Sequence, residues 1–118
     1  MMMPGMEYKQ GDIVVIPFPF TDLTAIKLRP VLIISHQDYN NAADDVVVCG
    51  ITSNLKDSLY SVLVDNAQLR EGHIPLTSRI KADKLFTLKQ SLIRKKVAVV
   101  QEQVLENVKQ EIRAVFHL

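Results

Sequence analysis

Short apolar runs separated by turn-forming residues make up most of the first three quarters of the chain. The run 13-IVVIPF-18 follows the turn pair 11-GD-12, and we expect Pro17 and Pro19 to end it, because proline cannot donate to a sheet ladder. The run 31-VLIIS-35 is almost entirely aliphatic, which is typical of a strand covered on both faces. Runs of this length, bounded by Gly, Pro, Asn and Asp, predict β-strands.

Three further segments extend this predicted β region. We expect strands over 46-VVVCGITS-53 and 59-LYSVLV-64, and either two short strands or one bent strand over residues 73–88. Clusters of Asn and Asp predict turns at 38–44 and at 54–58, on either side of the first of these strands.

The C-terminal segment 101–118 has a different period. Its apolar residues recur at spacings of three and four, which predicts an amphipathic helix whose apolar stripe packs on the strands. The stripe consists of Val104, Leu105, Val108, Ile112, Val115 and Phe116. A weaker helical turn is expected within 89–95. Several short strands followed by one helix predict a small β-barrel with helical additions.

Composition and charge exclude few classes of protein. The 118 residues suit one domain, 1–118, with 14 Lys plus Arg against 13 Asp plus Glu and a formal net charge of +1. Any basic surface for nucleic acid must therefore be local. The single cysteine, Cys49, lies in an apolar run and is expected to be a buried hydrophobe. The chain shows no signal peptide and no membrane-spanning run, so we expect a cytoplasmic location.

Familiar catalytic motifs are missing from the sequence. His36, His73 and His117 stand far apart, which argues against a metal site, and we expect no metal and no cofactor. Neither a glycine-rich phosphate loop nor a nucleophile elbow is present.

The loop after the first strand holds the most suggestive residues. Lys27 and Arg29 stand directly before Pro30 and the aliphatic run, at the expected mouth of a strand. A guanidinium suits bidentate phosphate recognition, and Phe18 and Phe20 are placed to stack on bases. Residue types alone nevertheless favour a simpler interpretation, in which Arg29 pairs with a loop acid such as Asp22 and both phenylalanines belong to the core.

The segment 51-ITSN-54 offers hydroxyl and amide groups at the expected end of a strand. Ser and Asn favour turns in any case, so this segment is weak support for a site when taken alone.

Taken in order, the segments 11-GDIVVIPFPFTDL-23, 28-LRPVLIIS-35 and 51-ITSN-54 resemble the MazF/PemK family of toxin endoribonucleases. The segment 80-IKADKLFTL-88 and the closing helix also fit, so the similarity covers nearly the whole chain. This resemblance implies a mainly β fold with α, namely an SH3-like β-barrel of the MazF/CcdB type with a C-terminal helix.

The resemblance also implies an activity, which is sequence-specific, metal-independent cleavage of single-stranded mRNA. The neighbouring 2′-hydroxyl is the nucleophile, and the products are a 2′,3′-cyclic phosphate and a 5′-hydroxyl. Arg29 matches the family's catalytic arginine and Thr52 its catalytic threonine. The implied RNA-binding residues are Phe20, Thr21, Lys27, Ser53, Asn54, Lys56 and Arg79.

One departure from the family concerns the general base. Several relatives place an acidic residue and a glutamine where this chain has Ser78 and Arg79, so no carboxylate is offered at that point. Either the base lies elsewhere in this chain, or its specificity and rate differ from those of the relatives.

The resemblance further implies a toxin of a toxin–antitoxin pair. Its expected partners are single-stranded RNA, a second copy of the chain in a homodimer, and a cognate antitoxin through whose complex it would bind DNA. Two alternatives remain, a non-catalytic barrel that only binds, and a protein-targeting gyrase toxin like CcdB.

Overall fold

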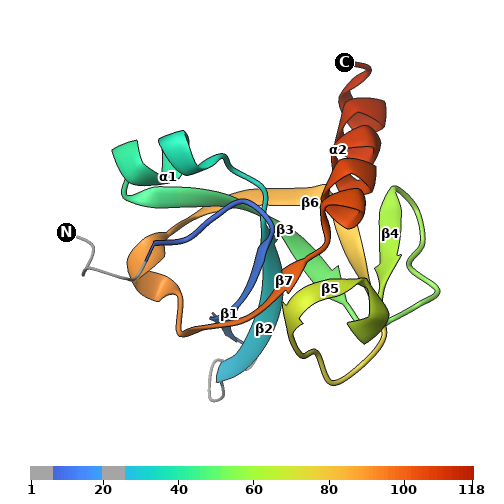
Figure 1. Cartoon of the computed structure of the whole chain (residues 1–118), viewed down its shortest axis with the longest axis horizontal. Helices are drawn as coiled ribbons and strands as arrows, with labels where there is room; N and C mark the ends of the chain where they lie inside the picture. Colours follow the sequence, from blue (N-terminus) through green and yellow to red (C-terminus); the bar gives the residue numbers. More distant parts are fainter. Residues whose placement is uncertain (1–6, 20–25) are drawn as a thin grey trace.

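The computed structural model describes residues 7–19 and 26–118, in which seven strands form one curled sheet (Figure 1). The strands are β1 (Asp12–Pro19), β2 (Ile26–Ile33), β3 (Asp45–Thr52), β4 (Ser61–Val64), β5 (Leu69–Gly72), β6 (Ser78–Lys89) and β7 (Lys95–Val100). The helical elements are α1 (Gln37–Ala42), α2 (Glu102–Phe116) and the 3₁₀ turns η1 (Asn66–Gln68) and η2 (Gln90–Leu92). The strand order is β4-β6-β3-β2-β1-β7-β5, and every pairing is antiparallel. This curled half-barrel with a C-terminal helix confirms the predicted fold class.

The central strands are buried on both faces, as the aliphatic run in β2 predicts. Consecutive residues of β2, Val31 and Leu32, belong to two different apolar clusters, because side chains alternate across a sheet. Both are almost fully buried. Cys49 in β3 is also buried, as expected, and its burial raises the pKa of the thiol to about 12.

The first two strands are longer than predicted, which changes the setting of Arg29. Beyond Val15, β1 pairs only with β2 among the described residues, and its other edge has no partner strand. A proline whose nitrogen faces that edge breaks no hydrogen bond of the sheet, so β1 can continue to Pro19. β2 begins at Ile26 and pairs Arg29 with Ile16. Arg29 therefore lies within a strand, and the prediction that it stands at a strand's mouth was wrong.

Other elements depart from the sequence-based prediction. The expected turn at 38–44 is largely the short helix α1, and the strands β5 and β7 were not predicted at all. Of the segment expected at 73–88, residues 78–88 belong to the single strand β6, whose register against β3 shifts between Cys49 and Gly50. That shift is a β-bulge, which bends the sheet.

The predicted C-terminal helix is confirmed as α2, which packs against β4 and β6 (Figure 1). Val104 and Val108 are buried, and Leu105 and Ile112 pack beside them. Phe116, at the end of the predicted stripe, is 57% exposed because the last turn of the helix projects beyond the sheet.

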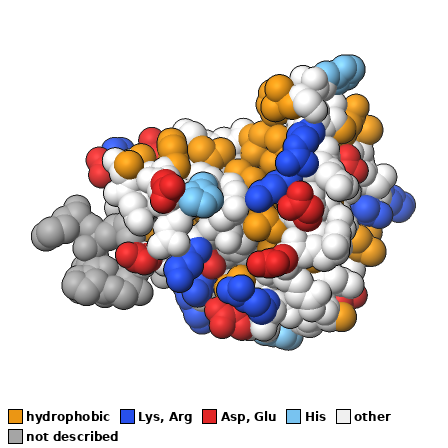
Figure 2. Space-filling model, turned by 45° about the horizontal axis from the view of Figure 1, so that its top comes forward, with side chains coloured by type: hydrophobic (Ala, Val, Ile, Leu, Met, Phe, Trp, Pro, Cys, Tyr) orange, Lys and Arg blue, Asp and Glu red, His pale blue; other side chains and the backbone are white. Residues whose placement is uncertain are grey.

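Basic and acidic side chains are interspersed on the face shown in Figure 2, in keeping with the near-zero net charge. This face therefore carries no extended field of one sign. None of the helices within residues 7–19 and 26–118 is long and apolar enough to cross a membrane.

Candidate active site

The sheet brings Arg29 and Thr52 to the same place. β2 pairs with β3 through Val31 opposite Gly50, and the same register continued two residues further sets Arg29 across from Thr52. Arg29 is exposed, and no salt bridge involves it among the described residues. The sheet thus places two residues that are 23 positions apart in the chain in the lining of one pocket.

Both residues line an open pocket of about 510 Å³ between β2, β3 and β6. Its lining combines apolar and aromatic groups with charged ones of both signs. The lining residues are Phe18, Arg29, Pro30, Val31, Gly50, Ile51, Thr52, Asp57, Lys81, Asp83, Lys84, Leu85 and Phe86. Phe18 and Phe86 meet edge to face, with ring centroids 6.0 Å apart. A pocket of this size suits a small ligand or one unit of a larger one.

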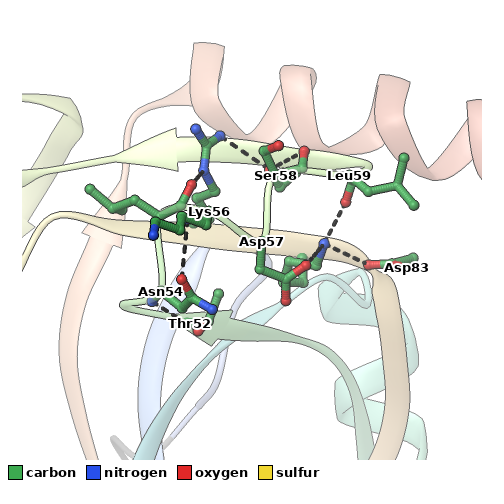
Figure 3. A network of polar contacts seen from close by, with 11 residues as sticks. Thr52, Asn54, Lys56, Asp57, Ser58, Leu59 and Asp83 are labelled. Carbon is green, nitrogen blue, oxygen red and sulfur yellow. Dashed lines mark hydrogen bonds and ion pairs between the residues drawn. The ribbon is translucent and has the colours of Figure 1, made fainter.

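Beyond Thr52 the chain turns through local hydrogen bonds (Figure 3). Thr52 Oγ1 accepts from the Asn54 backbone N–H at 3.1 Å, and Asn54 Oδ1 accepts from the Lys56 N–H at 3.2 Å. The side chains of Ser53, Asn54 and Lys56 are exposed beside the pocket, although none of these three lines it. Their predicted contacts with RNA stay predictions.

Three acceptors converge on the buried ammonium group of Lys81 (Figure 3). Lys81 Nζ lies 2.9 Å from Asp57 Oδ1, 3.5 Å from Asp83 Oδ1 and 2.5 Å from the Leu59 carbonyl oxygen. The Lys81 side chain is only 3% exposed. The hydrogen bond from Lys81 lowers the pKa of the Asp57 carboxyl, so Asp57 is anionic at neutral pH.

These three charged residues of the pocket were missed in the sequence. Asp57 was assigned to a turn, and Lys81 and Asp83 to a strand, with no role for their charges. The i, i+2 spacing of Lys81 and Asp83 on one strand face was an available signal. The structure shows that two carboxylates line the pocket even though Ser78 and Arg79 supply none.

The remaining predicted RNA-binding residues lie in different settings. Arg79 Nε donates to the Leu55 carbonyl at 2.6 Å, and a terminal guanidinium nitrogen donates to Ser61 Oγ at 3.3 Å. Arg79 thus uses part of its guanidinium to hold the segment after β3 in place. Lys27 is exposed on β2, opposite Phe18, and does not line the pocket. Phe20 and Thr21 lie outside the described residues.

The chemistry available in this pocket follows from its charges. Within the described residues no salt bridge uses the Arg29 guanidinium, which can bind an anion, and the Thr52 hydroxyl can donate while it accepts from the turn. Among residues 7–19 and 26–118, no group of three or more His, Cys, Asp and Glu side chains is arranged to hold a metal ion. The charged and aromatic residues of the pocket lining are Arg29, Lys81, Lys84, Asp57, Asp83, Phe18 and Phe86.

Solved structures with the same fold define the class. The chain superimposes on a MazE–MazF complex from Deinococcus radiodurans with a TM-score of 0.79 and 20% identity, covering 95% of this chain and 97% of that one. An endoribonuclease from a mycobacterial species, in complex with its cognate antitoxin, gives 0.75 and 18%, covering 96% of each chain. The Mycobacterium tuberculosis toxin MazF-mt6 gives 0.73 and 21%, covering 91% and 97%. At these identities the likeness shows that all four share the MazF fold.

The sequence itself carries the family assignment. Residues 9–116 match the model of the PemK-like, MazF-like toxins of type II toxin–antitoxin systems, and the chain belongs to this family. A search of curated proteins finds no match. The resemblance seen in the sequence is thereby confirmed.

Proposed function

We propose that this chain is an endoribonuclease toxin that cleaves single-stranded RNA at the pocket shared by Arg29 and Thr52. The observation that carries the proposal is the convergence of these two residues in one pocket, in a chain that belongs to the PemK/MazF toxin family. The pocket has an exposed cation for a phosphate, Arg29, and an aromatic wall for a base, which are the two features that single-stranded RNA requires.

In the proposed reaction the 2′-oxygen attacks the adjacent phosphorus, and the bond from phosphorus to the 5′-oxygen breaks. The 2′-hydroxyl loses its proton and the leaving 5′-oxygen gains one, so the products are a 2′,3′-cyclic phosphate and a 5′-hydroxyl. Arg29 stabilises the charge that builds up on the phosphorane. Its guanidinium is a poor proton acceptor at neutral pH, so its role is electrostatic. Thr52 donates a hydrogen bond to a phosphate oxygen.

The test is to incubate the purified protein with a long RNA in EDTA and to map the new ends. We expect cuts at a restricted set of sequences, with 2′,3′-cyclic phosphate and 5′-hydroxyl ends, because the attacking group belongs to the RNA. Cleavage that requires added Mg²⁺, or that leaves 5′-phosphate ends, would contradict the proposed chemistry.

We also propose that the chain acts as a homodimer restrained by a cognate antitoxin. Two of the similar solved structures are complexes with an antitoxin, named MazE in one of them. A dimer would bring two sets of Lys27 and Arg29 near each other, and such a local basic surface attracts both RNA and an acidic antitoxin segment.

Competition between the antitoxin and RNA tests the shared surface, and sedimentation tests the dimer. The antitoxin should displace RNA, and its association should slow as salt rises, because electrostatic steering is screened. An antitoxin that binds without displacing RNA would contradict the shared surface. A monomer in sedimentation at micromolar concentration would contradict the dimer.

A further inference from the structure

Asp57 lines the pocket but has no part in the proposed cleavage step, although its position is built into the fold. Asp57 lies in the turn region after β3, and its position depends on Lys81 of β6, which is 24 residues away in the chain. Lys81 also holds the Leu59 carbonyl oxygen, so it ties the segment 53–60 to the sheet at two points. A buried ammonium used in this way makes the location of Asp57 a fixed property of the pocket.

The two carboxylates on Lys81 differ in what they can contact. Asp83 has a side chain 25% exposed, and its Oδ1 is buried against Lys81. Asp57 has a side chain 45% exposed. Its Oδ1 is bonded to Lys81, and no group within residues 7–19 and 26–118 donates to its Oδ2. Asp57 therefore presents one ionised acceptor oxygen to the pocket.

Lys81 and Lys84 line the same pocket, and the hydrogen bond from Lys81 together with both charges lowers the pKa of Asp57, so its carboxyl stays ionised. The free oxygen of Asp57 repels a phosphate oxygen brought directly against it and needs a hydrogen-bond donor as its partner. The phosphate belongs with Arg29, and an uncharged part of the nucleotide must face Asp57. The aromatic edge formed by Phe18 and Phe86 lies in the same pocket and favours a nucleobase there. A nucleotide whose phosphate binds Arg29 can then offer its base to the aromatic edge and to Asp57, which line the same pocket.

Nucleobases differ in what they offer to a single acceptor. Adenine, cytosine and guanine each carry an exocyclic amino group that donates, and a carboxylate is a typical partner for such a group. Uracil has no amino group, and its one ring N–H is flanked by two carbonyl oxygens, which a carboxylate repels. An anionic acceptor with no donor of its own therefore discriminates against uracil.

We propose that Asp57, held in place by Lys81, is a specificity-determining residue that accepts a hydrogen bond from the amino group of a nucleobase, so that this pocket selects adenine, cytosine or guanine over uracil. The inference rests on the proposed function, because the pocket is the same one. Lys81 is a positioning residue, since its ammonium is occupied by protein acceptors.

The test compares cut sites in a pool of RNA randomised in sequence. Wild-type protein should disfavour uracil at one position near the cut. Asp57→Asn should reduce that discrimination about tenfold, because an amide can also donate to a uracil carbonyl, and one good base contact is worth about that factor or more. Asp38→Asn, which neutralises an exposed carboxylate outside the pocket, is the matched control and should leave the base preference unchanged.

Three outcomes would overturn the proposal. They are a wild-type preference for uracil at every position near the cut, an Asp57→Asn variant that loses cleavage equally on all sequences, and an equal change of preference in Asp38→Asn. The second outcome would make Asp57 purely structural.

A binding measurement keeps this inference separate from the proposed cleavage. Oligonucleotides of 2′-deoxyadenosine, 2′-deoxycytidine and 2′-deoxyuridine lack the attacking hydroxyl and can be compared by fluorescence anisotropy. We expect the first two to bind more tightly than the third, and Asp57→Asn to narrow the gap. If the protein cuts no RNA yet shows this gap, the cleavage proposal fails and the inference stands. If it cuts RNA and Asp57→Asn leaves the gap unchanged, the inference fails alone.

Discussion

Two cationic residues of the same pocket, Lys81 and Arg29, are used in opposite ways. Lys81 is buried on β6, and its ammonium is surrounded by two carboxylates and a carbonyl oxygen. Arg29 is exposed on β2, and no salt bridge in the described part of the chain involves it. Arg79, a near neighbour of Lys81 on β6, resembles Lys81 in using its donors on the chain after β3.

This difference distinguishes a charged residue that stabilises the fold from one that is available to a ligand. A charge whose partners are all within the protein stabilises the fold but cannot be offered to a ligand without breaking those contacts. A charge left exposed at the end of a strand pair costs the fold little and is available to a phosphate. Substituting Lys81 should therefore lower the stability of the fold, whereas substituting Arg29 should lower RNA cleavage.

The largest effect is expected for Lys81→Met, and it should be on stability. Removing one partner of a buried ion pair leaves Asp83 uncompensated, and we expect a loss of about 3 kcal/mol in the free energy of unfolding. The melting temperature should fall by roughly 10 °C. Lys89→Met, an exposed lysine on the same strand, is the matched control and should change little. Equal stability of the two variants in thermal denaturation would contradict a clamping role for Lys81.

Arg29→Ala should show the reverse behaviour. We expect RNA cleavage to fall at least about a hundredfold, the scale for removing one electrostatic donor to a transition state, with the melting temperature almost unchanged. Arg29→Lys should also lose most activity, because an ammonium does not reproduce the planar fork. Arg113→Ala, which removes an exposed arginine from α2, is the control for loss of charge. An Arg29→Ala variant that melts many degrees lower would make Arg29 structural.

A smaller effect is expected for Thr52→Ala. The hydroxyl contributes one neutral hydrogen bond, so cleavage should fall about tenfold. Thr52→Ser keeps the hydroxyl and its bond to the Asn54 N–H, and we expect it to retain most activity. If single-turnover rates of the two variants are the same, the hydroxyl has no role in the reaction.

The sequence predicts the strongly patterned parts of this fold and misses the weakly patterned ones. The helix over 101–118 has a clear period, and β1 and β3 are runs of β-branched residues. The segments that became α1 and β5, QDYNNA and LREG, have no apolar period of their own. α1 depends instead on contacts distant in sequence, such as the hydrogen bond from Asn40 Nδ2 to the Tyr8 carbonyl at 3.0 Å.

The residues of the site also fall into two groups, those that the sequence predicts and those that it misses. Arg29 and Thr52 could be named from the sequence because they lie in short segments that resemble a known family. Asp57 and Lys81 could not, because their contact depends on how β6 pairs with β3 and on the path of the segment 53–60. The resemblance therefore indicated where the reaction takes place, and the sheet pairing was needed to find what else lines the pocket.

We expect Arg29, rather than Lys81 or Arg79 of β6, to bind the RNA phosphate. A crystal structure of the protein with an RNA oligonucleotide that carries a 2′-deoxynucleotide at the mapped cut site tests it most directly. We predict a backbone phosphate within hydrogen-bond distance of the Arg29 guanidinium and the Thr52 hydroxyl, with the contacts of Lys81 to Asp57 and Leu59 intact. A phosphate bound instead by Arg79 or Lys81, with Arg29 untouched, would contradict the account.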